Sequence, residues 1–205
     1  MVNAGDAPFG QVARQLPGTR PGRRGAAALA RTLATHASAM TPPEVWLRGP
    51  IPGVAPLLQP VAHSLLQCRE EIESHVLPLT PAQTRARPGG AASIEYHVVH
   101  AAGSLDRLLT YARGEQLSDT QREALAAESG ERTDLQSVAA LVESFTAAVD
   151  RALEQVRSTP EGTLLEAREV GRKRLPTTVL GLLFHAAEHT QRHTGQVATT
   201  VRMVG

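Results

Sequence analysis

Aromatic residues are scarce in this sequence, with one tryptophan, two tyrosines and three phenylalanines among 205 residues. Most large apolar side chains are leucine and valine, so we expect one domain with a core of interleaved aliphatic residues. The single cysteine, Cys68, excludes an internal disulfide and is typical of a reducing compartment. No apolar run approaches the roughly 20 residues that a membrane-crossing helix needs. These absences predict a soluble, cytoplasmic protein with no membrane partner.

Charge is distributed unevenly along the chain. Residues 1–40 carry five arginines against one acidic residue, Asp6, which gives this segment a net charge of +4. Because the whole chain carries +1, residues 41–205 carry −3. The basic character therefore belongs to the N-terminal segment, and the rest of the chain offers no electrostatic case for nucleic-acid binding. We expect no nucleic-acid partner.

The N-terminal segment, residues 1–41, is rich in arginine, glycine and proline and has little to bury, so we predict a disordered extension. Two other interpretations are open. Arg23-Arg24 resembles a twin-arginine export signal, although the segment that follows is only weakly apolar. The segment could also be a nucleic-acid-binding arm. In the favoured interpretation, a disordered extension, the true translation start could be Met40. We predict that the folded domain spans residues 42–205.

Four segments repeat apolar residues every three or four positions, the period of a helix with one buried face: residues 54–76, 93–113, 134–156 and 176–203. Ser93 is suited to cap the second segment, and Pro176 to occupy the first turn of the last. Residues 164–175, around Gly171, predict a short β-hairpin. Cys68 lies on an apolar seam, which predicts a buried, unreactive thiol. The sequence therefore predicts an all-α four-helix bundle with an irregular segment before the last helix.

Histidines gather in two of these helices. His185, His189 and His193 recur at steps of four, and each step returns to nearly the same helical face with a drift of about 40°. His97 and His100 lie one turn apart on the second helix. Neutral imidazole is a common ligand of divalent metal ions, and a catalytic site typically takes three protein ligands. The sequence predicts a metal site formed by two histidines of the last helix and one of the second.

The spacing alone leaves the choice of ligands open. The pair on the last helix could be His189 with His193 or His185 with His189, and His97 could replace His100. Histidines that do not bind the metal could orient those that do, through the second ring nitrogen. The alternative interpretation is that these are ordinary packing and surface histidines. Five of the eight histidines in two short windows favour the metal site.

Two sequence motifs carry a resemblance to a known family. The segment from His189 to Gln196, HTQRHTGQ, resembles the His-x-x-x-His-Arg-Gly-Gln signature on the last helix of the DinB/YfiT-like superfamily. The segment from His97 to Asp106 is similar to the second-helix segment of that family, which supplies the first metal ligand. The resemblance covers residues 45–205 and includes the order of the helices and the irregular segment.

The resemblance implies an up-down-down-up bundle that binds a divalent metal ion, zinc (Zn), nickel (Ni) or manganese (Mn). The implied ligands are His100, His189 and His193, with His97 and His185 in reserve. The implied activity is a metal-dependent transferase of the low-molecular-weight thiol S-transferase type, or a hydrolase, acting on a small molecule. The resemblance also implies a homodimer. The alternative is a non-catalytic metal-binding or dimerising stress-response bundle.

The sequence departs from the family signature at Thr194, where the family usually has arginine. This difference could alter the support of the site but removes no ligand. The catalytic residues are not indicated: Glu188, Asp106 and the unused histidines are only candidates for a general base. Cys68, on its apolar seam, is not expected to supply a reacting sulfur.

Overall fold

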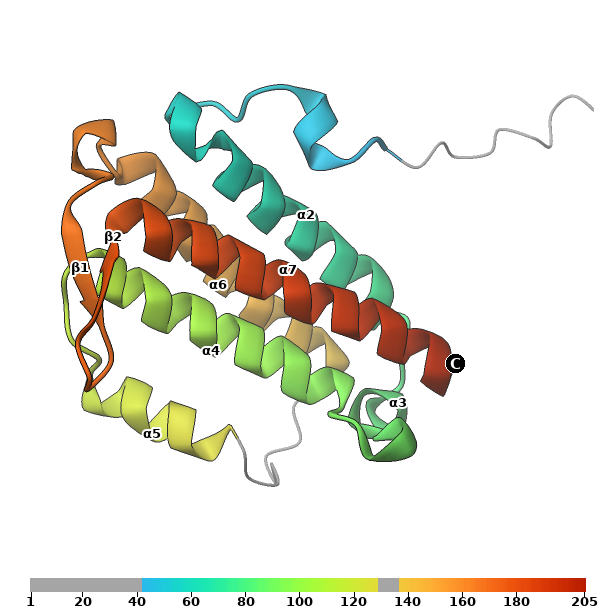
Figure 1. Cartoon of the computed structure of the whole chain (residues 1–205). Coiled ribbons are helices and arrows are strands. Elements are labelled where there is room, and N and C mark those ends of the chain that lie inside the picture. The colour runs from blue at the N-terminus through green and yellow to red at the C-terminus, as the bar shows by residue number, and fades with distance from the viewer. Residues whose placement is uncertain (1–41, 129–136) are drawn as a thin grey trace, which may run out of the picture. The chain divides into compact units, whose positions relative to one another are not determined.

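The computed structural model describes residues 42–128 and 137–205. Its four long helices are α2 (Gln59–Val76), α4 (Ile94–Ala112), α6 (Val138–Ser158) and α7 (Val179–Val204). Figure 1 shows α2 and α7 running in one direction and α4 and α6 in the other, the predicted up-down-down-up order. The predicted extension and the predicted start of the third helix lie outside the described residues. None of the described helices has the length and apolarity that crossing a membrane requires.

Helix α7 lies between α2 and α4, and α6 packs against α2 and α4 on the other side of the bundle (Figure 1). The apolar seams meet between the helices. Leu65, Leu105, Phe145 and Leu183, one from each long helix, are fully buried. Burial of each such side chain stabilises the fold by about 1.5–3 kcal/mol before the loss of conformational entropy is counted. The core is mostly aliphatic, as predicted from the composition.

The helices begin where short polar side chains can accept hydrogen bonds from their first turns. The Ser93 hydroxyl accepts from the backbone N–H of Tyr96, which confirms the predicted cap of α4. The prediction for Pro176 was wrong, because this residue lies in a strand and α7 begins three residues later. Thr178 is the cap of α7, and its hydroxyl accepts from the N–H of Gly181. Proline has no backbone N–H and cannot donate a hydrogen bond to a neighbouring strand. Pro176 is tolerated here because both strands of a two-stranded sheet are edge strands.

The predicted β-hairpin is present, a few residues later than expected. Strand β1 (Ala167–Val170) pairs with the antiparallel strand β2 (Leu175–Thr178), and Val170 lies opposite Leu175. Gly171 begins the turn with a φ of 69°, a conformation that glycine adopts without strain. The hairpin closes the end of the bundle at which α7 begins (Figure 1).

Two short helices occupy the segments that connect the long ones. Helix α3 (Pro81–Arg85) and helix α5 (Asp119–Ala127) both start with a capping box, in which a Thr or Ser hydroxyl and a Gln side chain bond each other's backbone N–H. Helix α5 runs along the outside of α4 (Figure 1). The remaining elements are single 3-10 turns: η1 (Val45–Arg48), η2 (Pro56–Leu58), η3 (Pro88–Gly90) and η4 (Glu161–Thr163).

Candidate metal centre

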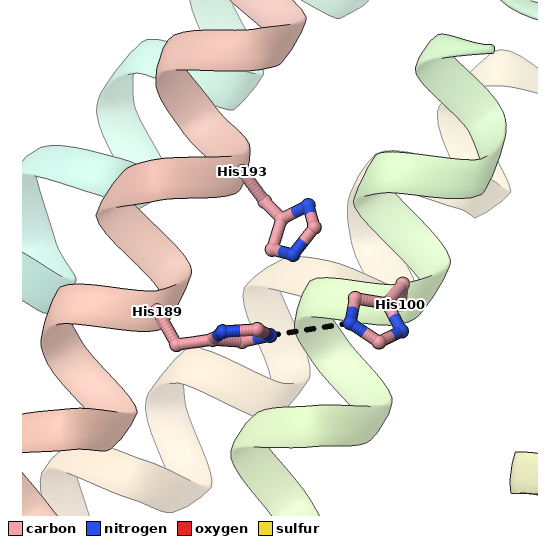
Figure 2. Close-up of side chains that lie close together, drawn as sticks. All are labelled: His100, His189 and His193. Carbon is pink, nitrogen blue, oxygen red and sulfur yellow. Dashed lines mark hydrogen bonds between the residues drawn. The ribbon is translucent and has the colours of Figure 1, made fainter. Parts of the chain in front are cut away.

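The two helices that carry the histidine clusters, α4 and α7, pack directly against each other. Helical spacing puts His189 and His193 on the side of α7 that faces α4, and His100 on the side of α4 that faces α7. One ring nitrogen of each of these three residues lies within 4.8 Å of the other two. Figure 2 shows the three rings converging in the space between the helices. This is the set of residues that the family resemblance implied.

The spacing of the nitrogens suits a shared divalent ion. His100 Nε2 and His189 Nε2 are 3.2 Å apart. Two ligands bound at about 2.05 Å to a tetrahedral ion stand about 3.3 Å apart, which is nearly the same separation. The ring of His193 lies 4.6 Å, centroid to centroid, from each of the other two rings. One ring nitrogen of each of the three histidines is thus close enough to the others to be directed at a shared ion.

Glu128, at the C-terminal end of α5, fixes the orientation of the His100 ring. Its Oε2 accepts a hydrogen bond of 2.7 Å from His100 Nδ1–H. Nε2 of His100 is then the nitrogen without a proton, the form that can bind a metal. Arg107 holds the same carboxylate through Nη1, which is 2.5 Å from Oε1, and it also donates to Ser104 Oγ. Arg107 and Glu128 are both largely buried and cancel each other's charge.

Gly103 makes room for this arrangement on α4. A Cβ atom at this position would stand 2.6 Å from Glu128 Oε1 and 2.9 Å from Arg107 Nη1. Neither approach is possible between non-bonded atoms without a displacement. A glycine inside a helix lowers helix stability by about 1 kcal/mol relative to alanine. Its presence in the middle of α4 is explained by the close approach of the carboxylate.

The two reserve histidines take different places. His97 is buried, and its Nδ1 is 3.1 Å from Nδ1 of His193. It therefore contacts one nitrogen of His193 and can leave the other, Nε2, for a metal. His185 is half exposed and pairs with Glu188, and it does not join the three-histidine group. His97 thus lies behind His193, where it can orient that ring, and His185 lies outside the three-histidine group.

Burial favours the neutral form of His97, His189 and His193. Loss of hydration, followed by the charges of the neighbouring His100 and His189, lowers the pKa of His193 to about 4. The pKa of His189 and that of His97 are lowered for the same reasons, first by burial and then by the charge of His100. Neutral imidazole is the form that binds a metal, so at pH 7 no proton has to leave these rings first.

The sequence did not predict Glu128, Arg107 or Ser104 as part of the centre. Arg107 is seven residues beyond His100 on the same face of α4, which was an available signal. Glu128 has no such signal, because its approach depends on how α5 lies across α4. The two carboxylates suggested as bases bond other residues: Glu188 bonds Arg192 and His185, and Asp106 accepts a hydrogen bond from Gln121.

The other expectations concern the opposite side of α7. Cys68 is fully buried, as predicted, and burial raises the pKa of its thiol to about 12. Its S–H donates to Gln191 Oε1 at 3.1 Å. Thr194 is also buried, and its hydroxyl bonds the carbonyl of Thr190 and lies near Cys68. Thr194, the residue at which this sequence departs from the family signature, therefore lies where α7 packs against α2.

Comparisons with known proteins agree with this architecture. The family model of the DinB superfamily matches residues 64–197, more than half of the chain. Among solved structures, the crystal structure of a conserved protein from Enterococcus faecalis is similar, with a TM-score of 0.57 and 20% sequence identity. That match covers 72% of this chain and 96% of the other, and at this identity it shows the fold alone. A search of curated proteins gave no match. With its bundle order and its histidine positions, the chain belongs to the DinB superfamily.

Proposed function

We propose that this protein binds a divalent metal ion, Zn, Ni or Mn, through His100, His189 and His193. The observation that carries the proposal is the convergence of three imidazoles from two helices, with nitrogens within 4.8 Å of one another. Among the described residues no cysteine or carboxylate joins the group. A donor set of histidines alone suits ions of this class, whereas Mg²⁺ and Ca²⁺ prefer oxygen.

We further propose that the centre is catalytic, in a thiol transferase or a hydrolase that acts on a small molecule. Structural zinc sites normally take four protein ligands, whereas catalytic sites take three and keep one position for water or substrate. A cavity of about 230 Å³ adjoins the centre, and His100 and His189 form part of its wall. The cavity leaves room for a ligand that does not come from the protein.

A divalent ion in this position supplies a positive charge that makes a coordinated water or thiol more acidic. The residues of the chain preserve that charge. Imidazole ligands add no negative charge, and Arg107 cancels the charge of Glu128, the carboxylate that bonds His100. Glu128 also holds His100 with Nε2 directed at the centre. Homodimer formation and the thiol cosubstrate remain predictions from the family resemblance.

The alternative is a bundle that binds metal without catalysis, or that only dimerises. A fourth protein ligand would favour it. The nearest candidate is His97, but it contacts His193 through Nδ1 and lies behind that ring. This position favours a supporting role and an open coordination position.

Metal analysis tests the proposal. We would purify the full chain without a histidine tag and measure bound metal by mass spectrometry, for the wild type and for His100→Ala, His189→Ala and His193→Ala. We expect about one ion per chain in the wild type and loss of metal in each variant. His185→Ala is the matched control, since it removes a neighbouring histidine outside the group and should keep the metal. A wild type that neither contains metal nor takes it up on reconstitution would refute the proposal.

A further inference from the structure

The cavity beside the histidines continues toward the end of the bundle where the hairpin lies. Its inner part, about 230 Å³, is lined by His100 and His189 and, farther out, by Tyr111, Leu117 and Leu125. The same three residues form part of the wall of a second hollow of about 610 Å³, under α5 and the hairpin turn. Because the two spaces share these walls, a ligand that enters from the outer hollow passes over an aromatic and two aliphatic side chains before it reaches the centre.

The outer hollow is cationic. Arg122 of α5 and Arg172 of the hairpin turn both line it, and none of its lining residues is acidic. Arg122 is already engaged, since its guanidinium donates to the carbonyl of Leu117 and to the carboxylate of Asp119. Arg172 is exposed and makes no ion pair with any residue in the described part of the chain. Its guanidinium is therefore the group in this hollow that can bind an anion.

The neighbourhood of Arg172 strengthens the positive charge. The turn reads Gly171-Arg172-Lys173-Arg174, and Arg174 is balanced by an ion pair with Glu169. Arg172 and Lys173 leave a net positive charge at the mouth of the hollow. An arginine guanidinium can bind a carboxylate or a phosphate with two parallel hydrogen bonds, whereas a neutral polar group gains much less.

We propose that the substrate of this centre carries an anionic group, a carboxylate or a phosphate, which Arg172 binds while a donor atom at the other end reaches the three histidines. The linking part of the molecule is apolar enough to lie against Tyr111, Leu117 and Leu125. This proposal rests on the proposed function, because it assumes that the substrate reaches a metal ion at the centre. It adds the chemical class of the substrate and a residue that selects it.

The test uses the full chain loaded with cobalt, in which binding of a thiol changes the visible and near-ultraviolet absorption. The probes are mercaptohexanoate, mercaptohexylphosphonate and mercaptohexanol, together with the undecyl members of the same three series. We expect one or both anions to bind about fivefold more tightly than the alcohol of equal length, the upper range for an exposed ion pair. A preference for the carboxylate or for the phosphonate identifies which anion the hollow favours.

Two variants locate the effect. Arg172→Gln should bring the affinities of anion and alcohol to within about twofold, with no change in cobalt content. Lys173→Gln is the matched control, because it removes the same charge from the next residue of the turn, outside the lining of the hollow. It should keep most of the preference. Equal affinities at both chain lengths, or a preference that Arg172→Gln leaves intact, would overturn the anion site. Cobalt content and the affinity for the alcohol probe test the metal centre independently of the anion site.

Discussion

Replacement of Glu128 by glutamine is the sharpest test of how the centre is held together. The change preserves the size of the side chain and removes one negative charge. Both carboxylate oxygens of Glu128 accept hydrogen bonds: Oε2 from His100 and from Arg107 Nη2, and Oε1 from Arg107 Nη1. Glutamine has one accepting oxygen and one donating NH₂ group. Whichever way the amide turns, its NH₂ faces an N–H of His100 or of Arg107.

The expected effects follow from this conflict. If the NH₂ group faces His100, the ring must move its proton from Nδ1 to Nε2, and Nε2 can then no longer bind a metal. Loss of such an orienting partner typically weakens metal binding by about 10- to 100-fold, which corresponds to about 1.4–2.7 kcal/mol. In either orientation the buried guanidinium of Arg107 loses its counter-charge. The free energy of unfolding should then fall by about 1–3 kcal/mol.

Two measurements separate these effects. Competition with a chromophoric chelator at constant pH gives the metal affinity, and urea denaturation of the metal-free chain gives the free energy of unfolding. Glu123→Gln is the matched control, since it makes the same chemical change on the exposed side of α5. Metal affinity in Glu128→Gln within twofold of the wild type would refute the idea that Glu128 sets the orientation of His100. A loss of stability alone would assign Glu128 a purely structural role.

Two further predictions concern the same centre. In Gly103→Ala the new methyl group displaces the Glu128 carboxylate, so chelator competition should show weaker metal binding. In the control Gly195→Ala the new methyl group meets no atom within 4 Å, so the free energy of unfolding should rise by up to about 1 kcal/mol. Equal metal affinity in the two variants would contradict the role of Gly103. The pKa of His193 is about 4, below its ordinary 6.5, so between these values the unfolded chain binds more protons than the folded one. The free energy of unfolding of the metal-free chain should therefore fall as the pH drops from about 6.5 to about 4, by at most about 3 kcal/mol from this residue. Urea titrations across this range check the slope, which His193→Gln should reduce, and a flat profile in the wild type would contradict the lowered pKa.

Much of the fold follows from local patterns in the sequence. The period of the apolar residues identifies the long helices because each of them buries one face, as Leu65 and Phe145 show. Ser93 was identifiable as a cap because a short polar side chain precedes an apolar run there. The error at Pro176 has a physical reason: proline suits the first turn of a helix and also an edge strand, and only the pairing of Pro176 with Glu169 decides between them.

The ligand set and its support differ in how far the sequence can reveal them. His189 and His193 are related by one helical turn, so their common face can be read from spacing alone. The support of His100 depends on a tertiary contact instead. Glu128 is 28 residues away, and only the position of α5 along α4 brings its carboxylate to the imidazole. Nothing in the local sequence distinguishes it from Glu123, five residues earlier.

The charges at the centre explain why the protein can hold its site ready before a metal arrives. In a site built from several carboxylates, removal of the ion leaves repelling charges that must be relieved by protonation or movement. Here the candidate ligands are imidazoles, which carry no negative charge, and the buried Glu128 is matched by Arg107. The metal-free centre therefore contains no cluster of repelling carboxylates, and the four apolar seams stabilise the bundle without the ion. For this reason the pH titration and the Glu128→Gln denaturation can be carried out on the metal-free chain, where each effect belongs to the protein's own side chains.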